Sequence, residues 1–181
     1  MRNGKRSSVR SAWKNPMPDI DLTQFCAKEA DSQYDFRAPF SKGPWTYATN
    51  RMIIIRVPRR EDVAEIDTGA TWLYDNPKLP DCEKIFSNAD GRGPYTWLDV
   101  PDVTLECHFA KSIPVKFEIN EVAIGLSSIL LDLIRKNLPN PQIGLIEAAA
   151  TTCKVLVPVK IRFDGGTGLL MPIRLSEARN G

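Results

Sequence analysis

The segment KVLVPVKIRFDGGTGLLMPIRL, residues 154–175, decides the fold that we expect for this chain of 181 residues. Between 154 and 163, apolar residues at every second position give one apolar face and one largely basic face. A period of two predicts a β-strand. Residues 164–166 are Asp-Gly-Gly, which predicts a hairpin turn because these residues tolerate positive φ angles. Residues 167–175 then return as the partner strand, and Pro172 places that strand near a sheet edge or a bulge.

Further extended segments lie nearer the N-terminus. The sequence predicts strands at 34–40, 45–49 and 52–57, separated by turn residues. The last of these contains an unbroken Met-Ile-Ile-Ile run, which is typical of a strand buried on both faces. Two more strands are expected at 104–110 and 113–119. These strands predict a mostly antiparallel sheet.

One amphipathic helix follows. No proline occurs between Pro114 and Pro139, Asn120 is a plausible N-cap, and Arg135 and Lys136 suit the last turn of a helix. Apolar residues recur at helical spacing at Val122, Leu126, Ile129, Leu130, Leu133 and Ile134. Residues 142–150 fit either a strand or a helix. We therefore expect an α+β fold, in which a curved, mostly antiparallel sheet carries one main helix on one face.

The net charge of +2 is the sum over segments whose charges differ strongly. Residues 1–15 carry a charge of +5, whereas residues 61–103 carry −7. We expect a flexible basic arm at 1–18 and a single domain at 19–175, with an acidic, aromatic insertion at 61–103 and a polar tail at 176–181. Within the insertion, only a short helix near 80–87 is expected.

Composition and cysteine spacing restrict the class of protein. A hydrophobic content of 43% excludes disorder of the whole chain, and the sequence contains neither a membrane-spanning apolar run nor a signal-peptide core, so we expect a cytoplasmic protein. The four cysteines are far apart, which argues against a zinc site and for buried thiols. His108 is the only histidine, and no Gly-rich phosphate loop opens a helix. We expect a non-enzyme without a metal or cofactor.

Three stretches carry a resemblance to a known family. WTYATNRM (45–52) resembles the aromatic-Ala-Thr-Asp-Gly strand and turn of bacterial DNA polymerase processivity clamps (β sliding clamps), and GLLMPIRL (168–175) is similar to their C-terminal Met-Pro-Met-Arg-Leu strand. Residues 114–136, a strand followed by an amphipathic helix, resemble the opening of a clamp domain. The resemblance implies the fold of one clamp domain, and a ring would require several copies of the chain.

The resemblance also implies a binding site. In clamps, the C-terminal strand helps to line a hydrophobic pocket that captures short peptides of polymerases and other partners. The matching residues here are Leu170, Met171, Pro172, Ile173, Arg174 and Leu175.

We therefore prefer the hypothesis of a small, clamp-like interaction protein of phage or mobile-element origin. Its partner would be a protein of replication or defence machinery, and self-assembly is compatible with this hypothesis. Besides the C-terminal strand, the acidic, aromatic segment offers a protein-binding surface. The candidate residues in that segment are Trp72, Trp97, Asp62, Glu65, Asp75 and Glu83.

Two alternatives remain open. The chain could be a DNA-binding replication accessory protein that binds phosphates through basic side chains. The candidate residues are Lys154, Lys160, Arg162, Arg135 and Lys136. The chain could also inhibit a nucleic-acid-binding complex, if the acidic stretch 61–103 imitates the charge of DNA.

Overall fold

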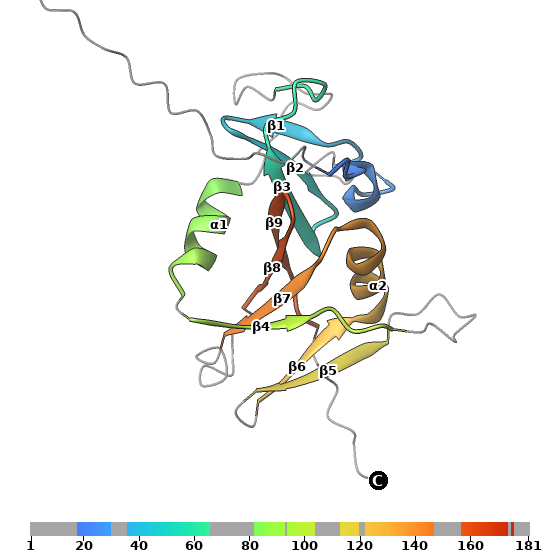
Figure 1. Cartoon of the computed structure of the whole chain (residues 1–181), viewed down its shortest axis with the longest axis vertical. Helices are drawn as coiled ribbons and strands as arrows, with labels where there is room; N and C mark the ends of the chain where they lie inside the picture. Colours follow the sequence, from blue (N-terminus) through green and yellow to red (C-terminus); the bar gives the residue numbers. More distant parts are fainter. Residues whose placement is uncertain are drawn as a thin grey trace, which may run out of the picture.

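The computed structural model describes residues 18–29, 36–65, 82–92, 94–103, 113–119, 122–146, 157–173 and 175. These residues form an α+β fold with a seven-stranded antiparallel main sheet and a second sheet of two strands (Figure 1). The main sheet contains, in spatial order, β1 (Phe40–Lys42), β2 (Trp45–Thr49), β3 (Ile53–Pro58), β9 (Gly166–Leu170), β8 (Val159–Phe163), β7 (Gln142–Ile146) and β4 (Tyr95–Asp99). The second sheet pairs β5 (Pro114–Ile119) with β6 (Val122–Ser127). The expected fold class is confirmed.

The β8–β9 hairpin lies at the centre of the main sheet. Gly165 in its turn has a φ of +92°, a conformation that side chains disfavour, so the glycine signal located the turn correctly. Strand β8 begins only at Val159, and the residues described before it, 157 and 158, lie outside any strand. Strand β9 ends at Leu170, because Pro172 cannot donate a ladder hydrogen bond. The expected continuation of this strand to residue 175 is therefore wrong.

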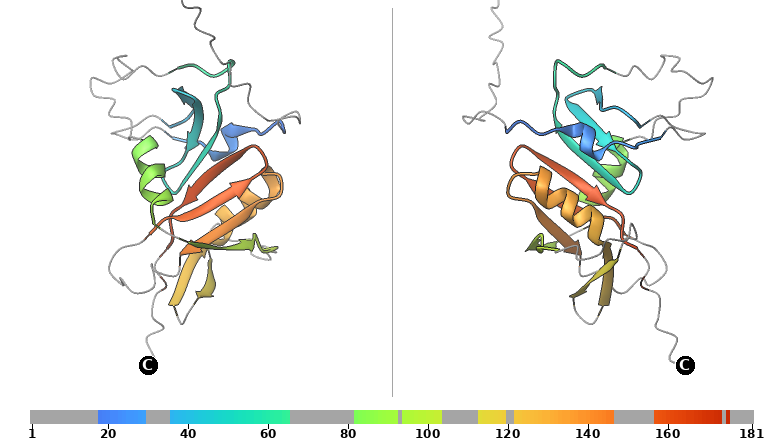
Figure 2. Two further views of the ribbon diagram at one scale, coloured as in Figure 1. Left: turned by 60° about the vertical axis from the view of Figure 1, so that its left-hand side comes forward. Right: turned by 90° about the vertical axis from the view of Figure 1, so that its right-hand side faces the viewer.

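Two layers cover the main sheet on opposite faces. Figures 1 and 2 show helix α1 (Cys82–Asp90) on one face and helix α2 (Ser128–Asn137) on the other. The α2 side holds the larger apolar core, which includes the short 3-10 helix η1 (Leu22–Phe25) and buried residues of β3, β6, β7 and β8. On the α1 side, a smaller cluster joins α1 to β1, β2, β3 and β9. Half-buried apolar residues of β5 and β6 pack against the larger core.

The start of α2 differs from the prediction. The helix begins at Ser128, and the Ser127 hydroxyl caps it by accepting a hydrogen bond from the Leu130 N–H at 3.3 Å. Residues 122–127 form strand β6 instead, so the predicted N-cap at Asn120 is wrong. The apolar positions 122, 124 and 126 also have the period of a strand, and pairing with β5 selects that alternative. Arg135 and Lys136 do lie in the last turn of α2.

Strand β4 was not expected. It lies inside the acidic segment 61–103, where only a helix was predicted, and it forms an edge of the main sheet by pairing with β7. The predicted helix is present as α1. The strand expected at 34–40 overlaps the observed strand β1 only at Phe40, because residues 36–39 lie outside any strand and β1 continues to Lys42. Residues 34 and 35 lie outside the described residues.

Two of the remaining predictions concern β3 and the segment 104–110. Ile53 and Ile55 of β3 belong to one core cluster and Ile54 to the other, which confirms burial on both faces, but Met52 precedes the strand and is 40% exposed. The strand expected at 104–110 lies outside the described residues.

Among the described residues, no helix is both long and apolar enough to cross a membrane.

Candidate functional site

The sheet face that carries α1 continues beyond the helix onto β8, β7 and β4. Val159, Ile161 and Phe163 of β8 point into the core on the α2 side, so the intervening Lys160 and Arg162 point to the α1 side. We call this surface the open face, because the apolar side chains of α1 pack over β1, β2, β3 and β9 and no described helix packs over the other three strands. The open face consists of Tyr95, Trp97, Asp99, Gln142, Gly144, the buried Ile146, Lys160 and Arg162.

Strand register sets six of these residues in two rows, and Tyr95 lies opposite Ile146 beside them. Gly144 of β7 lies opposite Trp97 of β4 on one side and Lys160 of β8 on the other. Gln142 lies likewise between Asp99 and Arg162. Directly paired residues on one face are close enough to interact, so each row brings together three segments that are far apart in the chain.

Trp97 is the central aromatic residue of the open face. Its ring lies over Gly144, because a Cβ atom built there would come within 2.9 Å of Trp97 Cζ3. The guanidinium carbon of Arg162 is 4.2 Å from the Trp97 ring centroid, and the Tyr95 ring centroid is 5.8 Å from that of Trp97. Lys160 Nζ is 5.2 Å from the Tyr95 centroid. Two aromatic rings and two cations therefore lie in mutual contact.

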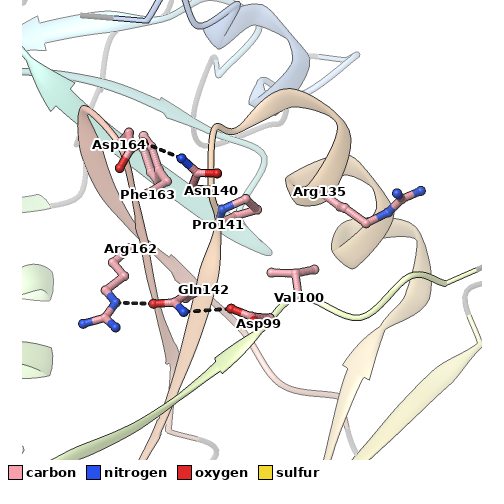
Figure 3. Close-up of a pocket in the computed structure, with 9 residues that line it drawn as sticks. All are labelled: Asp99, Val100, Arg135, Asn140, Pro141, Gln142, Arg162, Phe163 and Asp164. Atoms are coloured by element: carbon pink, nitrogen blue, oxygen red, sulfur yellow. Dashed lines mark hydrogen bonds between the residues drawn. The ribbon is translucent and has the colours of Figure 1, made fainter. Parts of the chain in front are cut away.

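A hydrogen-bonded chain fixes the second row. Arg162 Nε donates to Gln142 Oε1 at 2.8 Å, and Gln142 Nε2 donates to Asp99 Oδ1 at 2.7 Å (Figure 3). Both ends of the Gln142 amide are used, so its orientation is set by the network. The contacts found for Arg162 among the described residues are this bond and the Trp97 ring, and none of them is an ion pair. Its guanidinium therefore retains N–H groups that can bind an anion.

A cavity of about 530 Å³ adjoins this row where β4, β7 and β8 meet the end of α2. Opposite the row, Asn140 Nδ2 donates to Asp164 Oδ2 at 2.7 Å. Arg135 also lines the cavity, but Figure 3 shows its guanidinium directed away from the Arg162 row, and it pairs with Asp102 at 3.1 Å. The lining residues are Asp99, Val100, Arg135, Asn140, Pro141, Gln142, Arg162, Phe163 and Asp164.

A cluster of charges lies where α1 ends beside the open face. The carboxylate of Asp90, the last residue of α1, forms an ion pair with Lys160 Nζ and lies 3.8 Å from Arg56 Nη2. Arg56 Nε also donates to Thr167 Oγ1 at 3.1 Å. The Tyr95 hydroxyl donates to the carbonyl of Ala89, and burial together with Asp90 raises the pKa of that phenol. These contacts attach the end of α1 to β3, β8 and β4.

The structure thus brings together some of the predicted nucleic-acid-binding residues. Lys160 and Arg162 lie beside Trp97 on the open face, and Arg135 shares the cavity with Arg162. Lys136 pairs with Asp132 at 2.7 Å. Lys154 lies outside the described residues.

The predicted acidic residues have separate surroundings. Asp62 pairs with Arg60 at 3.2 Å and Glu65 with Arg59 at 2.7 Å, and these arginines lower the pKa values of both carboxyls. Glu83 accepts a hydrogen bond from the hydroxyl of the buried Tyr47, whose pKa is raised by burial and by this contact. Trp72 and Asp75 lie outside the described residues.

The predicted C-terminal binding segment joins the two sheets. Leu170 is fully buried in the larger core, and Pro172 is also buried. The Ile173 N–H donates to the Gly125 carbonyl of β6 at 2.8 Å, and a Cβ atom at Gly125 would come within 2.8 Å of Leu175 Cδ2. Met171, Ile173 and Leu175 are half-buried, and Arg174 lies outside the described residues. Of this segment, the half-buried residues retain surface that a partner could contact.

Several residues of the open face were missed by the sequence analysis. Tyr95 stands two positions from Trp97, so a strand reading of 95–99 would have placed both rings on one face. Gln142 and Gly144 show the same spacing in a segment whose structure was ambiguous. No local signal marks Arg56 or Asp90, because their contacts depend on how α1 packs.

Among the described residues, no three potential metal ligands lie together in a group. Cys26 and Cys82 are buried and form no disulfide among the described residues, and burial raises the pKa of Cys26 to about 11. Cys107, His108 and Cys153 lie outside the described residues. Comparisons with protein-family models, with curated proteins and with solved structures find no match for the chain.

Proposed function

We propose that this protein binds single-stranded nucleic acid on its open face, as a non-enzymatic accessory protein of nucleic-acid metabolism. The observation that carries this proposal is the stack of Arg162 on Trp97, which lies flat over Gly144 beside Tyr95. The same surface therefore offers stacking platforms for bases, namely Tyr95 and the Arg162 guanidinium that covers the outer face of Trp97, together with cations for phosphates. Proteins that bind single strands without strong sequence preference combine these two features.

The chemistry favours a single strand over a duplex. Aromatic faces can stack only on bases that are unpaired and unstacked, whereas the cations bind phosphates of either form. Stacking on one aromatic side chain contributes about 1–3 kcal/mol per base. The five cations among residues 1–15 add a long-range attraction for a polyanion, in keeping with the proposal.

Fluorescence anisotropy with a labelled oligothymidylate at low salt tests the proposal on the full chain. We expect Trp97→Ala to weaken binding about tenfold, since a stacking platform is lost. Arg162→Ala should also weaken binding and reduce the slope of log affinity against log salt by about 0.7, the value for one phosphate contact with a single strand.

Lys136→Ala is the matched control, because Lys136 is an exposed cation on α2 that pairs with Asp132. It should leave the affinity within about twofold, while circular dichroism verifies that each variant is folded. Absence of binding by the unmodified protein at low salt, or unchanged binding by Trp97→Ala, would refute the proposed function.

A second candidate is capture of a protein partner by the clamp-like C-terminal segment. It is favoured by an exposed methionine, Met52, whose carbonyl accepts a hydrogen bond from the N–H of the half-buried Met171 at 2.8 Å. Methionine side chains adapt to varied apolar partners. In a pull-down from the native host, Met171→Asp should abolish capture of a partner of nucleic-acid metabolism, whereas Met171→Leu should retain it. Equal capture by both variants would contradict this candidate.

A further inference from the structure

Two cations beside the open face share a single carboxylate. Asp90 contacts both Lys160 and Arg56, so the three side chains together keep a net charge of +1. The cluster lies next to the stacking residues, because Lys160 also approaches the ring of Tyr95. An anion that reaches Tyr95 along the open face therefore encounters this pair of cations.

The two cations are held in place by the sheet and by aromatic rings. The guanidinium carbon of Arg56 lies 4.7 Å from the Trp45 centroid and 4.0 Å from the Phe86 centroid, and its Nε is bonded to Thr167. The Arg56 and Lys160 side chains are only 14% and 18% exposed. Such fixed cations lose little conformational freedom when they bind an anion.

Asp90 is the replaceable member of the cluster. Its side chain is 45% exposed, and it is the last residue of α1, where a negative charge is unfavourable beside the free carbonyl groups of a helix end. The Asp90 carboxylate therefore does not stabilise α1 by interacting with the dipole of the helix. Its role lies in its contacts with Lys160 and Arg56.

Resting on the proposed function, we propose that Arg56 and Lys160 form a phosphate-binding position, which the Asp90 carboxylate occupies in the free protein. A phosphate of the strand whose bases stack on Tyr95 and on the Arg162 guanidinium above Trp97 replaces this carboxylate. Phosphate has the same sign of charge and more acceptor oxygens, and arginine binds it in a bidentate manner. Asp90 thus competes with nucleic acid and lowers the affinity of the protein for it.

The test measures binding of labelled oligothymidylate by Asp90→Asn in the full chain. We expect affinity to rise about three- to tenfold at low salt, and the salt slope to steepen by about 0.7, because one more phosphate contact releases counterions. Glu118→Gln is the matched control, since Glu118 is an exposed carboxylate on β5 that is paired with Lys116. It removes the same charge and should change affinity less than twofold.

A double-mutant cycle makes the test specific. Lys160→Gln should weaken binding, and Asp90→Asn should no longer strengthen it in that background. If Asp90 only attaches α1 to the sheet, Asp90→Asn will lower the melting temperature and leave affinity unchanged or weaker, which overturns the inference. Should Asp90→Asn not fold, Asp90→Ser is subjected to the same measurement.

The result is distinguishable from failure of the proposed function. Loss of affinity in Trp97→Ala together with no gain in Asp90→Asn would refute only the phosphate position. Absence of binding in the unmodified protein and in both variants would refute both proposals.

Discussion

The two faces of the main sheet differ in what their side chains do. On the α2 side, Val159, Ile161 and Phe163 of β8 are buried in the larger core, whereas on the opposite side Lys160 and Arg162 contact aromatic rings near solvent. One strand of five residues thus contributes to stability through one face and to a candidate binding surface through the other. Neighbouring positions of β8 therefore differ in their role: one set stabilises the fold, and the other contributes to the candidate binding surface.

The largest expected effect comes from substituting adjacent residues on opposite faces. Ile161 is fully buried, so Ile161→Ala should lower the free energy of unfolding by about 2–5 kcal/mol, through lost apolar burial and the cavity left behind. Arg162→Ala, one position later, should lower it by only about 0.5–1 kcal/mol, because Arg162 is exposed and its contact with the Trp97 ring is lost. Urea unfolding followed by circular dichroism measures both. Similar losses in the two variants would contradict the division of tasks between the faces.

A smaller effect on stability is expected from a substitution at Gly144, where β7 presents no side chain to the open face. Gly144→Ala places a methyl group within 2.9 Å of the Trp97 ring, so the ring must shift, at a cost of about 1–3 kcal/mol in unfolding free energy. Trp97 should then lose its contact with Arg162, and binding of oligothymidylate should weaken. Tryptophan emission and anisotropy report the two changes.

Gly91→Ala provides the control for that substitution. A Cβ atom at Gly91 has its nearest contact at 3.5 Å, to the Ser87 carbonyl, which is an ordinary van der Waals distance. We expect this variant to keep both its emission spectrum and its affinity. If Gly144→Ala also keeps its emission spectrum and its affinity, the position of the Trp97 ring does not depend on the absence of a side chain at residue 144.

The strands that could be predicted are those with strong local signals. The β8–β9 turn follows from Asp-Gly-Gly, and β2 and β3 follow from β-branched runs and the turn residues between them. Local patterns fail for β6, whose apolar spacing fits a helix as well as a strand, and the β5 pairing decides between them. Strand β4 lacks such a signal, since its half-buried, mixed residues become a strand only through pairing with β7.

The candidate site was predictable only in part, for a related reason. The alternation in 154–163 marked Lys160 and Arg162, and the aromatic content of the acidic segment marked Trp97. Their neighbourhood depends on contacts between distant segments: Gln142 and Asp99 are 43 residues apart in the chain, and Lys160 and Asp90 are 70 apart. Cross-strand register and the packing of α1 create these contacts, and neither is encoded in a short stretch of residues.

The position of β9 also bears on how the chain reaches this structure during synthesis. Strand β9 is the last strand of the main sheet to leave the ribosome, yet it lies in the interior of the sheet, between β3 and β8. Until it emerges, the early β1–β2–β3 meander and the later β4–β7–β8 group have no common partner strand. Half-formed sheet edges therefore persist until β9 emerges, and folding depends on contacts of long sequence separation, which form slowly.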